Sequence, residues 1–177
     1  MYNENMLQLS GSLLSKPVLS LRSGGPVARI VSPIFNPNNL KIEGFYCDDT
    51  IDKKRLVLLY QDIREFSQQG FIIDDHDVLA QPHELVRLKR LINLNFELLK
   101  KPVETTSKEK IGKVSDYAVE TTTMYVQKLY VSRSIIRNLT GGGLSIDRSQ
   151  IVEITNSRVI INDLLQGNPS PVTASIA

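Results

Sequence analysis

The chain has 177 residues, which is enough for one large domain or for two small ones of about 80 residues each with thin cores. Its composition is 41% hydrophobic and 23% charged, and no apolar run attains the roughly 18 residues that cross a bilayer, which excludes a membrane-inserted or largely disordered protein. The net charge of +2 is too small for a protein that mainly coats nucleic acid.

The charge is unevenly spread along the chain. Residues 1–85 carry eight Lys and Arg against eleven Asp and Glu, residues 86–137 carry eleven against five, and the remainder carries two against three. The beginning is therefore acidic and the middle basic. Because the N-terminus lacks the pattern of a signal peptide and the single Cys47 cannot form an internal disulfide, we expect a cytoplasmic protein.

Residues 1–11 are expected to form a flexible N-terminal tail. Residues 12–76, called repeat 1, are predicted to form short strands separated by turn residues at 23–26, 36–39 and 67–70. Within them, "LKIEGFYC" alternates between apolar and polar residues, as a half-buried strand does. This spacing favours a small β-barrel or sandwich.

Residues 77–98 are predicted to be a connecting segment that contains an amphipathic α-helix. Apolar residues at helical spacing would form one stripe: Leu85, Leu88, Ile92, Phe96 and Leu99. Pro82 suits the first helical position, and Glu84 lies in the first turn, where a carboxylate favours the helix dipole. We expect the stripe to pack between or against the two halves of the chain, or else to dock a partner.

Residues 99–163, called repeat 2, repeat the pattern of repeat 1, and residues 164–177 are expected to form a flexible C-terminal tail. The motif "KPV" at position 16 returns at position 101, and residues 56–75 align without a gap on residues 144–163. Six of these twenty positions are identical, which predicts an internal duplication. The identical pairs are Leu56/Leu144, Ile63/Ile151, Glu65/Glu153, Ile72/Ile160, Ile73/Ile161 and Asp75/Asp163.

Two stretches in each repeat are characteristic: "KPVLSLRSGGPVARIVSPIFNP" and "LLYQDIREFSQQGFIIDD" in repeat 1, and "KPVETTSKEKIGKVSDYAVE" and "QIVEITNSRVIIND" in repeat 2. With these stretches both repeats resemble the PRC-barrel domain, which is found in the photosynthetic reaction centre H subunit and at the C-terminus of the ribosome maturation factor. The resemblance implies a mainly β fold of two small PRC-type β-barrels in tandem. It also implies an assembly, docking or maturation module without shared catalytic residues.

The residues themselves offer little catalytic chemistry. The segment "DDHDVLAQPHE" collects metal-ligand residue types, but it lacks the spacing of a zinc or calcium site, so we interpret it as a solvated turn. Cys47 lies beside two carboxylates that would suppress its thiolate, and "TGGGLS" lacks the Lys of a phosphate-binding loop. We predict no enzyme activity, no cofactor and no metal.

One surface signal favours nucleic acid. In "VQKLYVSRSIIRN" Lys128, Tyr130 and Arg133 would fall on or near one strand face, with Arg137 nearby, and basic residues interleaved with an aromatic can bind RNA phosphates and bases. An ordinary solvated strand face explains the same pattern.

We therefore expect a non-enzymatic scaffold or adaptor that binds a protein partner, as a monomer or an oligomer. The alternative hypothesis is an RNA- or ribosome-associated maturation factor, and an enzyme ranks third. RNA binding would weaken steeply with salt because it rests on phosphate contacts.

Overall fold

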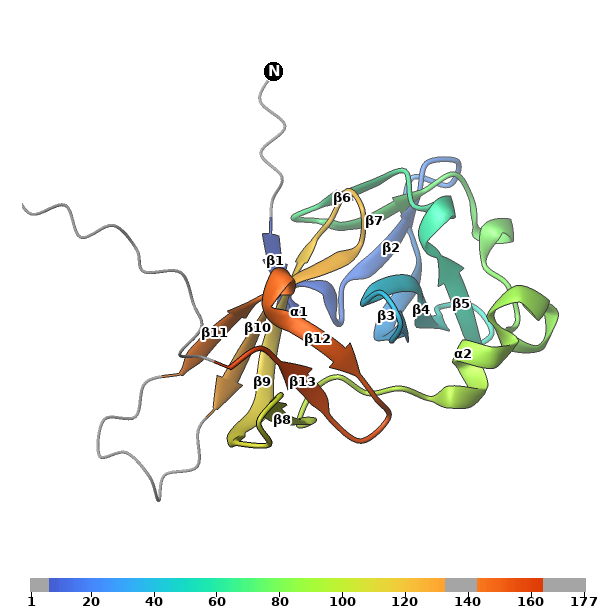
Figure 1. The fold of residues 1–177 in the computed structure, drawn as a ribbon. Helices are drawn as coiled ribbons and strands as arrows, with labels where there is room; N and C mark the ends of the chain where they lie inside the picture. The colour runs from blue at the N-terminus through green and yellow to red at the C-terminus, as the bar shows by residue number, and fades with distance from the viewer. Residues whose placement is uncertain (1–6, 133–142, 164–177) are drawn as a thin grey trace, which may run out of the picture.

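The computed structural model describes residues 7–132 and 143–163, which form a mainly β fold on one sheet of thirteen strands (Figure 1). Repeat 1 contains β2 (Pro17–Ser20), β3 (Pro26–Asn36), β4 (Lys41–Asp49), β5 (Arg55–Leu59), the 3₁₀ turn η1 (Tyr60–Asp62), β6 (Glu65–Ser67) and β7 (Gly70–Ile73). Repeat 2 contains β8 (Pro102–Thr105), β9 (Lys110–Glu120), β10 (Tyr125–Ser132), β11 (Leu144–Asp147), the 3₁₀ turn η5 (Arg148–Gln150), β12 (Ile151–Ile154) and β13 (Val159–Ile161). The other elements are β1 (Leu7–Leu9), α1 (Ser10–Leu13), the 3₁₀ turns η2 (His76–Val78), η3 (Pro82–Glu84) and η4 (Val86–Leu88), and α2 (Lys89–Leu94).

The two repeats connect their strands in the same way. In repeat 1, β2, β3, β4 and β5 pair antiparallel in succession, β6 pairs with β7, and β7 returns to lie parallel to β2. Repeat 2 has the same succession from β8 to β11, the same hairpin of β12 and β13, and the same parallel return of β13 to β8. The duplication predicted from the sequence therefore extends to the strand pairing.

The register repeats as well. Ile72 pairs with Leu19 in repeat 1, and Ile160 pairs with Glu104 in repeat 2, which are the positions that the sequence alignment makes equivalent. Each long hairpin also contains two bulges, and those in the middle of β3 and β9, at Val31 and Ser115, lie at equivalent positions. Such bulges bend a strand locally, so the two repeats curl alike.

The strand ladders do not close into rings. Among the described residues, no pairing joins β5 to β6 or β11 to β12, so each repeat is a rolled sheet that remains open. The prediction of a mainly β fold is thus confirmed, whereas two closed barrels are not observed among the described residues. A single bridge between Val57 and Ala80 extends the β5 edge of repeat 1.

The lysine of the repeated "KPV" motif has a structural role in both copies. The Lys16 Nζ donates a hydrogen bond of 2.7 Å to the carbonyl of Gln68, in the turn between β6 and β7. The Lys101 Nζ donates one of 2.6 Å to the carbonyl of Asn156, in the turn between β12 and β13. The motif recurs because it fastens the start of each repeat to its last hairpin.

The repeats meet through a pseudo-two-fold contact between β4 and β10. The Ile42 N–H donates to the Met124 carbonyl at 2.8 Å, and the Val126 N–H donates to the Leu40 carbonyl at 2.9 Å. An offset of 84 residues converts the first hydrogen bond into the second. This is the geometry of a symmetric dimer interface, formed here within one chain.

Equivalent segments before each repeat pack on the other repeat. We call residues 7–14 strap 1 and residues 92–99 strap 2, which correspond at an offset of 85. Strap 1 precedes repeat 1, but its β1 pairs with the end of β9 in repeat 2, from Leu7 opposite Glu120 to Leu9 opposite Ala118.

The expectation of a flexible tail over residues 1–11 is therefore wrong for residues 7–11, which are held by a strand more than 100 residues away. Residues 1–6 and 164–177 lie outside the described residues.

Strap 2 and the residues before it correct the helix prediction. Residues 82–94 form two 3₁₀ turns and the short α2, which ends where Asn95 adopts a left-handed conformation with φ of 46°. Pro82 does begin its turn, and Glu84 accepts a hydrogen bond of 2.9 Å from the Gln81 N–H. Pro82 and Glu84 thus hold the positions expected for the start of a helix, but the single long helix is not formed.

The apolar stripe is only partly buried. Leu85, Leu88 and Ile92 are half-buried, Leu99 is 37% exposed, and Phe96 is 8% exposed. The Phe96 ring packs edge-on against Phe35 of repeat 1, with 6.1 Å between the ring centroids. Phe96 is thus the member of the stripe that joins strap 2 to the core, which is one continuous cluster across both repeats.

Candidate functional site

Lys128 lies on the partly exposed face of β10, as the alternation along that strand predicted. Its Nζ is 3.4 Å from Oδ1 of Asp147 on β11, and both side chains are well exposed. The carboxylate offsets the charge that RNA phosphates would require. Arg133 and Arg137, the other basic members of the predicted patch, lie outside the described residues.

Tyr130 shares the outer face of β10 but lies between polar and acidic neighbours. It pairs with Asp116 on β9 and with Ser145 on β11. An acidic side chain directly across the ladder is unfavourable for a nucleic-acid surface, because it repels phosphate at the position where a base would stack. The described part of the patch therefore gives the RNA hypothesis no further support.

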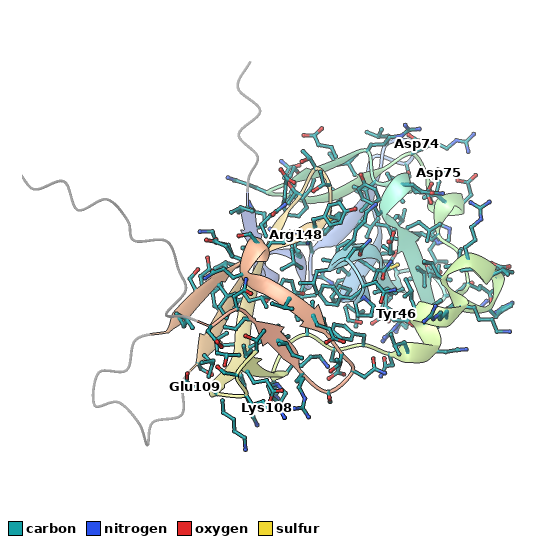
Figure 2. The ribbon with its side chains drawn as sticks, viewed as in Figure 1. Tyr46, Asp74, Asp75, Lys108, Glu109 and Arg148 are labelled. Carbon is teal, nitrogen blue, oxygen red and sulfur yellow. The ribbon has the colours of Figure 1, made fainter. Side chains whose placement is uncertain are left out.

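The acidic pair after β7 is bound by arginines. Figure 2 shows Asp74 and Asp75 at one end of repeat 1, where Asp74 accepts a hydrogen bond of 2.8 Å from Arg64 and Asp75 forms an ion pair of 2.9 Å with Arg22. The guanidinium partners hold the pKa of both carboxyls below the ordinary value. Across the described residues, no three potential ligands come close enough together to hold a metal ion.

His76 contacts a different carboxylate, that of Asp49. The His76 Nε2 lies 3.1 Å from Oδ1 of Asp49, whose side chain is only 3% exposed. Burial raises the pKa of Asp49, but hydrogen bonds from the Ile51 N–H and from His76 outweigh it, so the pKa lies below its ordinary value. This carboxylate thereby organises the loop after β4.

Cys47 is buried in the sheet and is not poised to react. Its side chain is fully covered, and burial followed by the charge of Asp48 raises the pKa of the thiol to about 12. A thiol with that pKa carries almost no thiolate at neutral pH.

A cavity of about 330 Å³ lies at the junction of the two repeats, on the inner side of strap 2. Repeat 1 contributes Phe35 from β3 and Tyr46 from β4, repeat 2 contributes Tyr117 from β9, and strap 2 contributes Leu98. Figure 2 shows Tyr46 near the segment that leads from α2 to β8. Both straps contribute to the cavity, because its lining includes Leu14 and Leu99, the equivalent last residues of strap 1 and strap 2.

The cavity lies where strap 2 lacks the side-chain hydrogen bond that fastens strap 1 to its sheet. On repeat 2, the Ser10 Oγ donates a hydrogen bond of 2.6 Å to Oδ1 of Asp116, which fastens strap 1 to β9. The equivalent residues on repeat 1 are Asn95 and Ser32, and no hydrogen bond joins these two side chains. Both line the cavity instead.

Tyr117 brings to this site a hydroxyl without a hydrogen-bond partner among the described residues. The residue is 2% exposed, and its ring packs edge-on against Phe35 with 5.4 Å between centroids. Among the described residues its hydroxyl has no hydrogen-bond partner. Every described side-chain nitrogen or oxygen that is fully buried does have a partner, so an atom without one cannot be fully buried. The hydroxyl is therefore accessible, and burial raises the pKa of Tyr117 so that it stays neutral.

Three larger hollows, of about 620, 530 and 540 Å³, are less suited to specific binding, and the last of them lies beside Lys128, Asp147 and Arg148. The first lies over β8 and β9 beside Lys110, Lys113 and Arg158, and the second lies between η1 and η4. Each belongs to one side of the molecule, and none of the polar side chains that line them is buried. Binding sites are preferentially found at junctions between folded units, which favours the smaller cavity.

The chain matches no model of a known protein family, and no curated protein is similar to it at a significant level. In the described part of the chain, no helix is long and apolar enough to cross a membrane.

Sequence reasoning did not find the junction cavity. Of its lining, only Phe96 and Leu99 belonged to a predicted surface, the apolar stripe. A signal was present, since "LSGSLLSKPV" and "LNFELLKKPV" align and differ where Gly11 corresponds to Phe96. That substitution marks the point at which the two straps pack differently.

Proposed function

We propose that this protein is a cytoplasmic, non-enzymatic adaptor made of two PRC-type barrels in tandem, and that it binds a protein partner at the junction cavity. The observation that carries the proposal is the broken symmetry at the straps. Strap 1 is fastened to repeat 2 by a side-chain hydrogen bond, whereas strap 2 and the repeats leave between them an apolar cavity with the accessible hydroxyl of Tyr117. Pockets that lose their water at the centre of an interface, surrounded by a rim of weaker contacts, are where protein partners usually make their strongest contacts.

The rim of the cavity fits a protein surface of mixed polarity better than it fits a strongly charged partner. Glu97 and Lys100 are both exposed at the cavity, so the two charges offset each other, and Leu99 adds an apolar contact. A rim with mixed polar groups around an apolar centre is the usual anatomy of a protein interface.

Site-specific photocrosslinking tests the proposal. A photoreactive phenylalanine analogue placed at Leu99, on the rim, should capture a discrete protein in cells that make this chain, and the purified partner should then bind the unmodified chain in calorimetry. The same analogue at Val86, which is 80% exposed but does not line the cavity, is the matched control. Equal capture at both positions, or no binding by the purified partner, would reject the junction as the partner site.

The RNA- or ribosome-associated function is tested separately. RNA retention that falls steeply with salt and is lost in Lys128→Glu would favour it. The ion pair of Lys128 with Asp147 leads us to expect no such retention.

A further inference from the structure

The lining of the junction cavity selects the chemistry of its occupant. Phe35 already has two edge-to-face neighbours, Phe96 and Tyr117, with centroid distances of 6.1 and 5.4 Å. Tyr46 contributes a further ring to the lining. Aromatic pairs in such offset or edge-on arrangements are more favourable than their buried area alone accounts for, so a further ring entering this cavity would be stabilised by the walls.

The cavity also excludes charge. Its two charged side chains, Glu97 and Lys100, are exposed at the rim, whereas the inner lining is made of rings, leucines, Pro33 and uncharged polar groups. A charged group that entered would lose its hydration without a buried partner of opposite sign, which is strongly unfavourable. A neutral group that accepts a hydrogen bond would instead satisfy the Tyr117 hydroxyl.

We propose that the cavity binds the side chain of a tyrosine presented by the partner protein, with its ring against Phe35 and its hydroxyl hydrogen-bonded to Tyr117. This inference rests on the proposed function, because it names the anchor by which a partner would occupy the same site. A phenol fits both requirements, since it is flat, neutral and able to accept as well as donate a hydrogen bond. The volume of about 330 Å³ lies at the lower end of ligand pockets, as a single anchor requires.

Titration of the isotope-labelled full chain followed by NMR tests the anchor without knowledge of the partner. The probes are N-acetyl-tyrosinamide, N-acetyl-phenylalaninamide and N-acetyl-lysinamide, with p-cresol as the free phenol. We expect millimolar binding of the tyrosine probe with shifts at Phe35, Tyr46 and Leu98, about three- to tenfold weaker binding of the phenylalanine probe, and none of the lysine probe.

Two variants sharpen the test. Tyr117→Phe should fold normally and remove the preference for tyrosine over phenylalanine, whereas Tyr130→Phe, a tyrosine outside the cavity, should retain it. Ser32→Trp should fill the cavity and abolish all aromatic shifts, whereas Val86→Trp should not. Persistence of the preference in Tyr117→Phe, or shifts that do not map to the cavity, would overturn the proposal.

The remaining outcomes separate the anchor from the adaptor function. Binding of p-cresol without binding of N-acetyl-tyrosinamide would mean that the site takes a free phenol, which overturns the partner anchor. If no aromatic probe binds while crosslinking at Leu99 still captures a partner that binds in calorimetry, the tyrosine anchor is wrong but the adaptor function stands. If the tyrosine probe binds as expected and crosslinking finds no partner, the cavity chemistry is right and the proposed function fails.

Discussion

Strap 1 and strap 2 occupy equivalent places but are bonded to their sheets differently. Strap 1 adds the strand β1 to the edge of β9 and is fastened there by Ser10 and Asp116. Strap 2 is helical up to Leu94 and is held by the ring of Phe96, without the corresponding hydrogen bond. A strap whose backbone is hydrogen-bonded to the sheet can have a glycine, Gly11, at this position. A strap without those hydrogen bonds needs a large apolar side chain there, and in strap 2 this is Phe96.

The largest expected effect comes from removing that anchor. Phe96→Ala should lower the free energy of unfolding by about 3 to 5 kcal/mol, because it creates a cavity beside Phe35 and detaches strap 2. Urea denaturation measures the loss. Leu99→Ala, at 37% exposure in the same strap, should cost less than about 1 kcal/mol. Similar losses for the two variants would show that Phe96 does not anchor strap 2.

A second comparison concerns Gly112 in β9 and its equivalent Ala28 in β3. Gly112 has φ of 156°, and a Cβ built on it would lie 2.1 Å from the carbonyl oxygen of Ser132. Gly112→Ala should therefore cost about 2 kcal/mol or more.

Gly25→Ala is the control for that substitution, because no atom lies within 4 Å of the added methyl group. It should change the free energy of unfolding by less than about 0.5 kcal/mol in the same denaturation experiment. A tolerated Gly112→Ala would show that β9 can adopt the backbone of β3.

The two "KPV" lysines should differ less. Lys101 is 9% exposed, and its Nζ lies 4.4 Å from the Phe96 ring centroid, whereas Lys16 is half-buried without such a ring. Lys101→Ala should cost about 1 to 2 kcal/mol and Lys16→Ala about 0.5 kcal/mol, since only Lys101 loses buried stem packing and a cation–π contact. Chemical denaturation of both variants is the measurement, and equal losses would contradict the expected difference between the repeats.

The smallest expected effect is a pH dependence at the equivalent residues Asp75 and Asp163. Hydrogen bonds from Arg22 and Ser107, respectively, lower the pKa of these carboxyls below the ordinary value. Their stabilisation is therefore complete above about pH 4 and is lost as the pH falls through the lowered pKa. Thermal melts of Asp75→Asn and Asp163→Asn from pH 2 to 7 should approach the wild-type curve at the acid end.

The contributions of these two carboxylates to stability should depend differently on salt concentration. Asp75 faces a guanidinium, so its contribution should shrink in 1 M NaCl, whereas Asp163 accepts hydrogen bonds from neutral groups at Thr106 and Ser107 and should keep its contribution. Identical salt responses would show that Arg22 contributes nothing through its charge.

The sequence was sufficient to predict the repeated strand pattern because the duplicated residues lie at pairing positions. Ile72 and Ile160, for example, both pair with the strand that begins each repeat. The packing of each strap on the other repeat could not be predicted, since β1 consists of three residues whose partners lie more than 100 positions away. Short segments carry too little periodicity to distinguish a tail from an edge strand.

The helix prediction failed for a local reason. The apolar spacing from Leu85 to Leu99 satisfies a helical pattern, but Leu85 adopts a non-helical backbone between η3 and η4, and Asn95 ends α2 in the left-handed region. The cavity was equally hidden, because it lies where Ser32 and Asn95 are not joined by the hydrogen bond that their equivalents Asp116 and Ser10 form. Sequence patterns record the groups that are present more readily than the contacts that are missing.

The reciprocal hydrogen bonds between β4 and β10 have a consequence for how this molecule can change over generations. They have the pattern of a two-fold dimer whose two copies were joined into one chain, and in such a dimer every substitution occurs twice. In the fused chain each copy varies independently. The cation and ring of Lys41 and Tyr60 have already exchanged roles in the equivalent Arg148 and Tyr125. By the same freedom, one half can remain closed to preserve the fold while the other acquires a binding site.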